Sequence, residues 1–374
     1  MKYLLTLLLS SLLINSLSCS FQEKIFSRMN KDKKGKNLII SPLSILQALS
    51  LLANGAKEET LSQMLEMFES NTIDELNDIN FKIISLFKDF TTMEIANAVM
   101  TRFTPLEDFS NIAEEYLAPV EPLVSLEQVN NWCRNKTHGK IDKIIEFLDP
   151  TTLMIILNAV YFKGEWFYKF DSDLTKNLSF YNLGKDEILI ETMSQFGIFK
   201  YYEDKKVQAI ELGFVKDFMT AIIILPNEET DINKYIETLF TSNEEFALIT
   251  KGLKSSRVHL QLPKFELSCN YTIGGILGSL GMINAFSPDL SDLTGLRKEG
   301  NLFVSEVIHK TYLRVFEDGC EAAAVTAIDI MGGGPQVEEK IYDMKINRPF
   351  LFLLKNYKMP AGYELIFMSK IEKL

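Results

Sequence analysis

Residues 317–335 carry the clearest signal in this chain: Glu317-Asp-Gly-Cys-Glu-Ala-Ala-Ala-Val-Thr-Ala-Ile-Asp-Ile-Met-Gly-Gly-Gly-Pro335. Every second residue from Cys320 to Ile330 is small or apolar, whereas the alternate row carries Glu321 and Asp329. Successive side chains of a strand point to opposite faces, so this pattern predicts a strand with one buried and one wet face. The flanking Glu-Asp-Gly bend and the Gly-Gly-Gly-Pro end disfavour regular structure. The segment therefore has the sequence of a buried strand, although its flanking residues are typical of a loop. This combination indicates a loop that can become a strand in a conformational change.

Eight further motifs surround this segment. They are Ile40-Ser-Pro-Leu-Ser-Ile45, Gly55-Ala-Lys-Glu-Glu-Thr60, Asn130-Asn-Trp-Cys-Arg-Asn-Lys-Thr-His-Gly-Lys-Ile141, Leu157-Asn-Ala-Val-Tyr-Phe-Lys-Gly-Glu-Trp166, Leu262-Pro-Lys-Phe265, Leu280-Gly-Met282, Ile308-His-Lys310 and Asn347-Arg-Pro-Phe-Leu-Phe352. In this order, and together with the loop, they resemble the serpins, a family of serine-protease inhibitors. The resemblance covers nearly the whole chain.

The resemblance implies an α+β fold: a single domain of residues 21–374 with three β-sheets, eight to nine helices and an exposed reactive-centre loop at about residues 317–340. Composition agrees with one large domain. The 374 residues are 47% hydrophobic and 24% charged, and no Pro/Gly/Ser-rich linker or internal repeat divides them.

The matching family positions assign roles to two further groups of residues. The hinge of the loop would be Glu317, Gly319, Cys320, Glu321, Ala322, Ala323 and Ala324. A buried hydrogen-bond cluster beneath the opening of the large sheet would contain Ser41, Ser44, Asn158 and His309, with Trp166 at the top of the sheet where the loop begins to insert. A core histidine and a core tryptophan are the alternative interpretations of the last two positions.

The implied activity is that of a suicide substrate. A serine protease would cut the loop, form an acyl-enzyme and be carried along as the hinge side inserts into the central sheet. Family spacing places the cut between Gly333 and Gly334, whereas the apolar side chain of Met331 favours the bond to Gly332. No Arg or Lys lies between Glu317 and Lys340, so a chymotrypsin-, elastase- or cathepsin G-like target is favoured over a trypsin-like one. The alternatives are a non-inhibitory carrier, chaperone or storage serpin, and a cross-class inhibitor of a cysteine protease.

Catalysis, metals and cofactors are not expected. The chain has only three histidines (His138, His259 and His309) and lacks H-E-x-x-H, a P-loop, a dinucleotide G-x-G-x-x-G and G-x-S-x-G. Its four cysteines include no C-x-x-C pair. A net charge of −11 argues against nucleic acid or an anionic membrane as a partner. Activation by heparin is also not expected, because the helix that would bind it, near residues 74–90, carries only Lys82 and Lys88 as basic residues. The protein is expected to be a monomer.

Residues 1–20 have the layout of a secretory signal: Lys2 precedes an apolar run, and small residues follow at Ser18 and Ser20. The sequence therefore predicts an extracellular protein, with a cytoplasmic one as the alternative, in which this segment starts the first helix. Candidate N-glycosylation acceptors of the N-x-S/T type are Asn135, Asn177 and Asn270.

Overall fold

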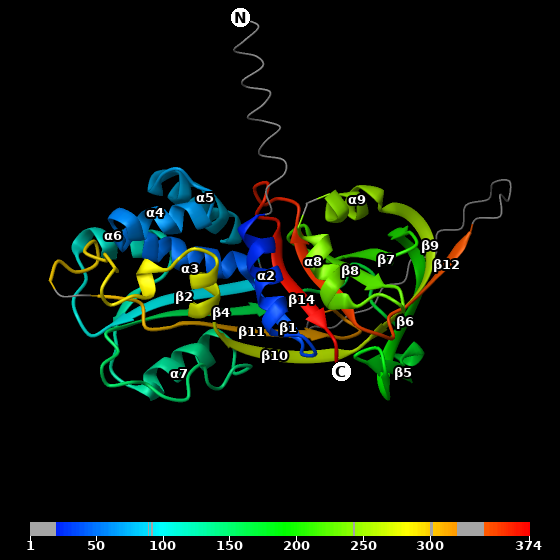
Figure 1. Ribbon diagram of the computed structural model, residues 1–374. Helices are drawn as coiled ribbons and strands as arrows, with labels where there is room; N and C mark the ends of the chain where they lie inside the picture. The colour runs from blue at the N-terminus through cyan, green and yellow to red at the C-terminus, as the bar shows by residue number, and fades with distance from the viewer. Residues whose placement is uncertain (1–19, 89, 91–92, 242–243, 300–301, 320–339) are drawn as a thin grey trace, which may run out of the picture.

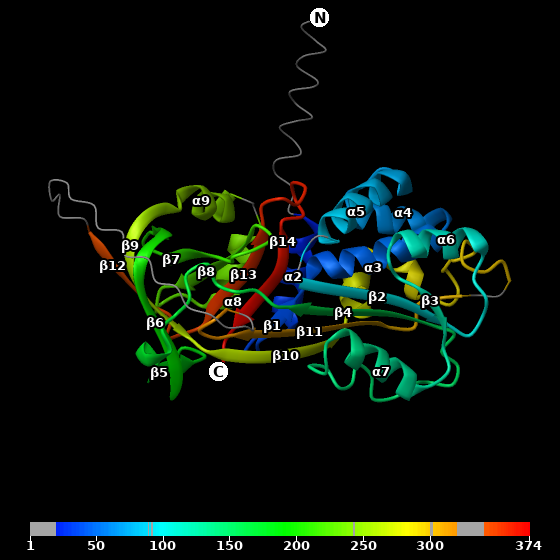
Figure 2. The ribbon, with the colours of Figure 1, turned by 180° about the vertical axis from the view of Figure 1, so that it is seen from behind.

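The computed structural model describes residues 20–88, 90, 93–241, 244–299, 302–319 and 340–374 (Figure 1). Their strands form two sheets, one of five strands and one of nine. Helices gather on the upper side of the five-stranded sheet, and α7 (Leu126–Lys136) covers the opposite side (Figures 1 and 2).

The five-stranded sheet has the order β10-β11-β4-β2-β3. Its strands are β10 (Phe265–Thr272), β11 (Val307–Val315), β4 (Met154–Phe162), β2 (Met93–Thr101) and β3 (Val120–Pro122). Every residue of β4 is buried, which explains its nearly unbroken apolar sequence. The decisive feature is that β4 and β11 are parallel and pair directly, from Val307 opposite Ile156 to Tyr312 opposite Tyr161.

The nine-stranded sheet has the order β1-β14-β13-β8-β7-β6-β9-β12, with β5 paired to β6. Its strands are β1 (Leu38–Ile40), β14 (Leu365–Ile371), β13 (Phe350–Asn356), β8 (Met219–Pro226), β7 (Val207–Gly213), β6 (Asp186–Glu203), β9 (Lys254–Pro263), β12 (Ile341–Lys345) and β5 (Lys176–Asn182). β6 is 18 residues long and pairs with β5, β9 and β7 along its length. The second and third sheets expected from the sequence are therefore joined by one continuous strand.

Nine α-helices occur in the described part of the chain. They are α2 (Phe21–Asp32), α3 (Pro42–Gly55), α4 (Glu58–Met67), α5 (Ile73–Phe87), α6 (Glu107–Glu115), α7 (Leu126–Lys136), α8 (Ile232–Leu239), α9 (Glu244–Gly252) and α10 (Gly274–Ser279). The expected α+β class and helix number are confirmed. α3 begins where Pro42 fixes the first helical residue and the Ser41 hydroxyl accepts a hydrogen bond from the Ser44 amide. This N-terminus places both serines against β4 and β11.

The core divides across the five-stranded sheet. On one face α7 packs through Val129, Trp132 and Cys133 against Leu157 and Tyr312 of the sheet. The opposite face joins the larger core, which includes α2, α3 and the nine-stranded sheet. β4 and β11 thus lie between two apolar layers, and any strand inserted between them would also have to fit between those layers.

Candidate functional site

A tight turn ends β11 at residues 316–319. The Gly319 amide donates to the Phe316 carbonyl and the Phe316 amide donates to the Gly319 carbonyl, both at 3.1 Å. Gly319 also forms an antiparallel bridge with Glu165, just beyond the end of β4. The chain therefore reverses at the end of β11, and Gly319 lies between Phe316 and Glu165, the residues that extend β11 and β4.

Glycine is required at position 319 for two reasons. Its φ is +126°, a backbone conformation that L side chains rarely adopt. A Cβ atom there would lie 2.2 Å from the carbonyl oxygen of Gly164. The turn thus lies directly against the backbone that continues β4.

Gly319→Ala is expected to detach this turn from the end of β4, because neither the backbone nor its neighbour can make room for a methyl group. We expect a loss of unfolding free energy of at least about 3 kcal/mol and a red shift of Trp166 fluorescence. The matched control is Gly184→Ala, where φ is +70° and a Cβ would meet nothing within 4 Å. A loss at position 319 no larger than that of the control, measured by chemical denaturation, would contradict the proposed contact.

Glu317 anchors the same turn through its side chain. Thr175 Oγ1 donates to Glu317 Oε1 at 2.7 Å, and Lys264 Nζ lies 3.2 Å from the same oxygen. Partial burial opposes ionisation of this carboxyl, but the hydrogen bonds from Thr175 and Lys264 outweigh it and lower its pKa. The hinge end of the loop is therefore fixed by an ionised glutamate.

Trp166 contacts the same turn through hydrogen bonds. Its side chain is 1% exposed and stacks on Phe214, with ring centroids 4.5 Å apart. The indole Nε1–H donates to the Phe316 carbonyl and the Trp166 amide donates to the Asp318 carbonyl, each at 3.0 Å. The structure thus places Trp166 in direct contact with residues 316–318, apart from the other four residues predicted with it.

Those four residues lie together on the side of the β4–β11 pair that faces α3. The Ser41 amide donates to His309 Nε2 at 3.0 Å, and His309 Nδ1 lies 2.8 Å from Asn158 Oδ1. Asn158 Nδ2 donates to Ser44 Oγ and, at 2.7 Å, to Asn97 Oδ1. The cluster therefore connects α3 with β2, β4 and β11.

Asn97 is the member that sequence reasoning missed. It lies on β2 in direct register with Asn158. Its only signal in the sequence is a polar residue in the middle of an otherwise largely apolar strand.

The cluster fixes the tautomer of His309. A backbone amide can only donate, so Nε2 of His309 must accept, and Nδ1 carries the proton that Asn158 receives. His309 is fully buried, and this burial lowers its pKa to about 3. The imidazole is therefore neutral at physiological pH, and protonation would place an N–H against the Ser41 N–H.

The remaining predicted positions lie elsewhere. Cys320–Ala324 of the hinge and the scissile-bond candidates Met331–Gly334 fall outside the described residues. The three glycosylation candidates are exposed, and Asn270 Nδ2, the atom that a glycan would occupy, donates to the Ile144 carbonyl. Glycosylation remains a prediction.

The described residues include no candidate metal site and no candidate membrane-spanning helix. They contain no group of three or more His, Cys, Asp or Glu residues placed to hold a metal ion. Within the same residues, no helix combines the length and the apolar content that crossing a membrane requires.

Comparisons with known proteins agree with this architecture. A family model described as "Serpin (serine protease inhibitor)" matches residues 16–373. The leukocyte elastase inhibitor of Xenopus laevis is 30% identical over 364 residues, covering 92% of this chain and 95% of that protein. The crystal structure of the thermophilic serpin tengpin in its native state has a TM-score of 0.84 and 31% identity, covering 95% of this chain and 93% of that one. Human thyroxine-binding globulin complexed with its hormone has a TM-score of 0.83 at 25% identity, covering 95% and 96%. This chain belongs to the serpin family.

Proposed function

We propose that this serpin inhibits a serine protease by inserting its cleaved loop between β4 and β11. The observation that carries the proposal is the turn at Gly319, which places this residue between Phe316 and Glu165, the residues that extend these two strands. Because β4 and β11 are parallel, a chain that turns back from the end of β11 runs antiparallel to both. It can therefore form backbone hydrogen bonds to β11 on one side and to β4 on the other.

Insertion exchanges one ladder for two. The direct pairing between Val307–Tyr312 and Ile156–Tyr161 must open, and each inserted residue then pairs with both neighbours. Each added hydrogen bond contributes about 0.5–1.5 kcal/mol, whereas ordering the loop costs about 1–2 kcal/mol per residue. These contributions nearly cancel, so a strained uncut sheet must supply the remaining driving force.

The side chains of the loop support insertion. The row Cys320, Ala322, Ala324 and Thr326 is small, and such residues fit between packed layers without displacing them. A non-inhibitory serpin would be expected to carry bulky or charged residues in this row. The observation that keeps this alternative open is the similarity to thyroxine-binding globulin, whose described complex contains a small hormone.

We further propose a chymotrypsin-, elastase- or cathepsin G-like target. Met331 offers the large apolar side chain that such pockets accept, and the loop contains no basic residue before Lys340. The relative from Xenopus laevis is named for the inhibition of an elastase. A cysteine protease attacking the same loop is the remaining alternative.

The test is incubation with purified serine proteases of these three classes, together with trypsin and a papain-like enzyme. We expect a complex that survives SDS with an elastase- or chymotrypsin-like enzyme, and a released C-terminal peptide whose mass gives the scissile bond. The mass would distinguish cleavage after Met331 from cleavage after Gly333. Complete cleavage of the loop by every protease without any stable complex would contradict inhibition.

A further inference from the structure

Three strands of the nine-stranded sheet bring a serine, a histidine and an aspartate together. Ser194 on β6 has its Oγ 3.1 Å from Nε2 of His259 on β9, and Nδ1 of the same ring lies 3.3 Å from Oδ1 of Asp343 on β12. The sequence separates these residues by tens of positions, and the sheet order β6-β9-β12 makes them neighbours. This Ser–His–Asp row is distinct from the His309 cluster.

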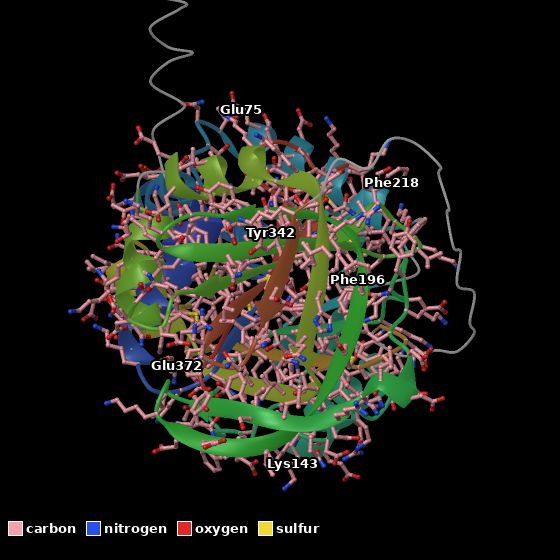
Figure 3. The ribbon with its side chains drawn as sticks, turned by 90° about the vertical axis from the view of Figure 1, so that its right-hand side faces the viewer. Glu75, Lys143, Phe196, Phe218, Tyr342 and Glu372 are labelled. Carbon is pink, nitrogen blue, oxygen red and sulfur yellow. The ribbon has the colours of Figure 1, made fainter. Side chains whose placement is uncertain are left out.

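The three side chains share the outward face of this part of the sheet. His259 is in register with Asp343 on one side and with Phe196 on the other, and Ser194 is two residues from Phe196 on the same face. The side chains of His259 and Asp343 are 41% and 66% exposed. Figure 3 looks at this region, with Phe196 labelled on β6 and Tyr342 on β12. Small molecules can therefore reach the row from solvent.

The order of the three groups suits nucleophilic chemistry. The Asp343 carboxylate lies close enough to Nδ1 of His259 to favour the tautomer with the proton on that nitrogen, and in this tautomer the lone pair on Nε2 faces the Ser194 hydroxyl. A neutral imidazole in this position can remove the hydroxyl proton as the oxygen attacks an electrophile. We propose that Ser194 is an activated nucleophile that accepts acyl or phosphonyl groups from activated esters and fluorophosphonates.

The reaction breaks one bond for each bond that it forms. Ser194 Oγ forms a bond to the carbonyl carbon or the phosphorus, its proton moves to His259 Nε2, and the bond to the leaving group breaks. With an aryl ester the proton then goes to the departing phenolate; with a fluorophosphonate fluoride leaves and the proton is released to water. Gln261 is the register partner of Ser194 on the same face of the sheet.

Apolar side chains beside the row indicate the class of substrate. Phe196, Ile198 and Ile341 are 58%, 63% and 55% exposed, so three large apolar side chains on this face are open to solvent. Ile198 and Ile341 are both in register with Arg257, so they flank the same position of β9. This surface fits the aryl or alkyl part of an ester and favours it over a charged substrate.

The electrostatic surroundings of His259 come from all three strands. Asp343 and Lys345 lie on β12, Arg257 lies on β9 and Lys200 lies on β6, all on the outward face. This activity is independent of loop insertion, and its test separates it from protease inhibition.

The experiment treats the full chain with 4-nitrophenyl butyrate and, separately, with a biotinylated fluorophosphonate, and maps the adduct by peptide mass. We expect up to one equivalent of nitrophenolate in a burst and the adduct on Ser194. His259→Gln and Asp343→Asn should each slow modification by about tenfold or more, and Ser194→Ala should abolish it. Ser255→Ala is the matched control, because Ser255 lies on the same face of β9, and it should leave the rate unchanged.

Two results would overturn the proposal. One is an adduct on residues other than Ser194. The other is a Ser194 adduct that forms equally fast in wild type, His259→Gln and Asp343→Asn. Melting curves show whether the variants are folded. Asp343→Asn keeps nearly the size and shape of the side chain. It therefore tests the role of the carboxylate even if His259→Gln perturbs the sheet.

Discussion

Cleavage of the loop is expected to raise the melting temperature by at least about 10 °C. The uncut molecule contains a parallel β4–β11 pair, and an inserted strand would convert it into two antiparallel pairs within a six-stranded sheet. Relief of strain in the uncut sheet adds to this gain. For a domain of a few hundred residues, each kcal/mol of added stability raises the melting temperature by roughly 2–4 °C or less, so several kcal/mol are required.

The measurement is a thermal scan before and after the loop is nicked by a protease that does not become trapped. The matched pair of variants is Ala324→Arg and Ala323→Arg, which introduce the same side chain on opposite faces of the proposed strand. An unpaired charge between packed layers costs several kcal/mol, so Ala324→Arg should reduce the increase in melting temperature and turn the inhibitor into a substrate. Ala323→Arg, on the row of Glu321 and Asp329, should retain most of both properties.

Equal melting temperatures for the cut and uncut forms would indicate a serpin that does not insert its loop. A different failure would be equal effects of the two arginines. That result would leave insertion intact and show that the alternation in residues 320–330 is in the wrong register. The two outcomes are therefore distinguishable.

The sequence predicted individual strands better than it predicted their pairing. The apolar run from Met154 to Phe162 has the composition of a strand buried on both faces, and the structure places it at the centre of the five-stranded sheet. Asn158 in its middle is a polar residue that must find partners once buried. Its partner Asn97 could not be identified, because nothing local to β2 specifies which residue of β4 lies opposite.

The Ser194–His259–Asp343 row could not be predicted for the same reason, because strand pairing was unknown. Each residue alone is an ordinary polar group on the outward face of an alternating strand, and no motif links the three. Their proximity depends on two registers, β6 with β9 and β9 with β12, and a shift of one residue in either would turn the side chains to opposite faces. The sequence lacks known catalytic motifs, but a site assembled across three strands leaves no local motif.

His309→Ala is expected to lower the unfolding free energy by about 3–5 kcal/mol at pH 7.5. The substitution leaves a cavity and removes the acceptor of the Ser41 amide and the donor to Asn158 Oδ1, both of which are buried. His309→Gln keeps a hydrogen-bonding side chain of similar reach and should lose less. The measurement is chemical denaturation, followed through the first unfolding transition.

The pH dependence tests the buried neutral imidazole directly. Burial lowers the pKa of His309 from 6.5 to about 3 in the folded chain. Between these two values the unfolded chain binds a proton that the folded chain does not, so this residue makes stability fall as the pH drops from 6.5 toward 3. At pH 5 the loss is about 2 kcal/mol relative to pH 7.5.

Neither His309→Ala nor His309→Gln can titrate, so both should lack this loss and share one pH profile, although their stabilities at pH 7.5 differ. If wild type and the two variants lose the same free energy between pH 7.5 and 5, His309 is not held neutral in the folded protein, and the hydrogen-bond directions assigned around Ser41 and Asn158 are wrong.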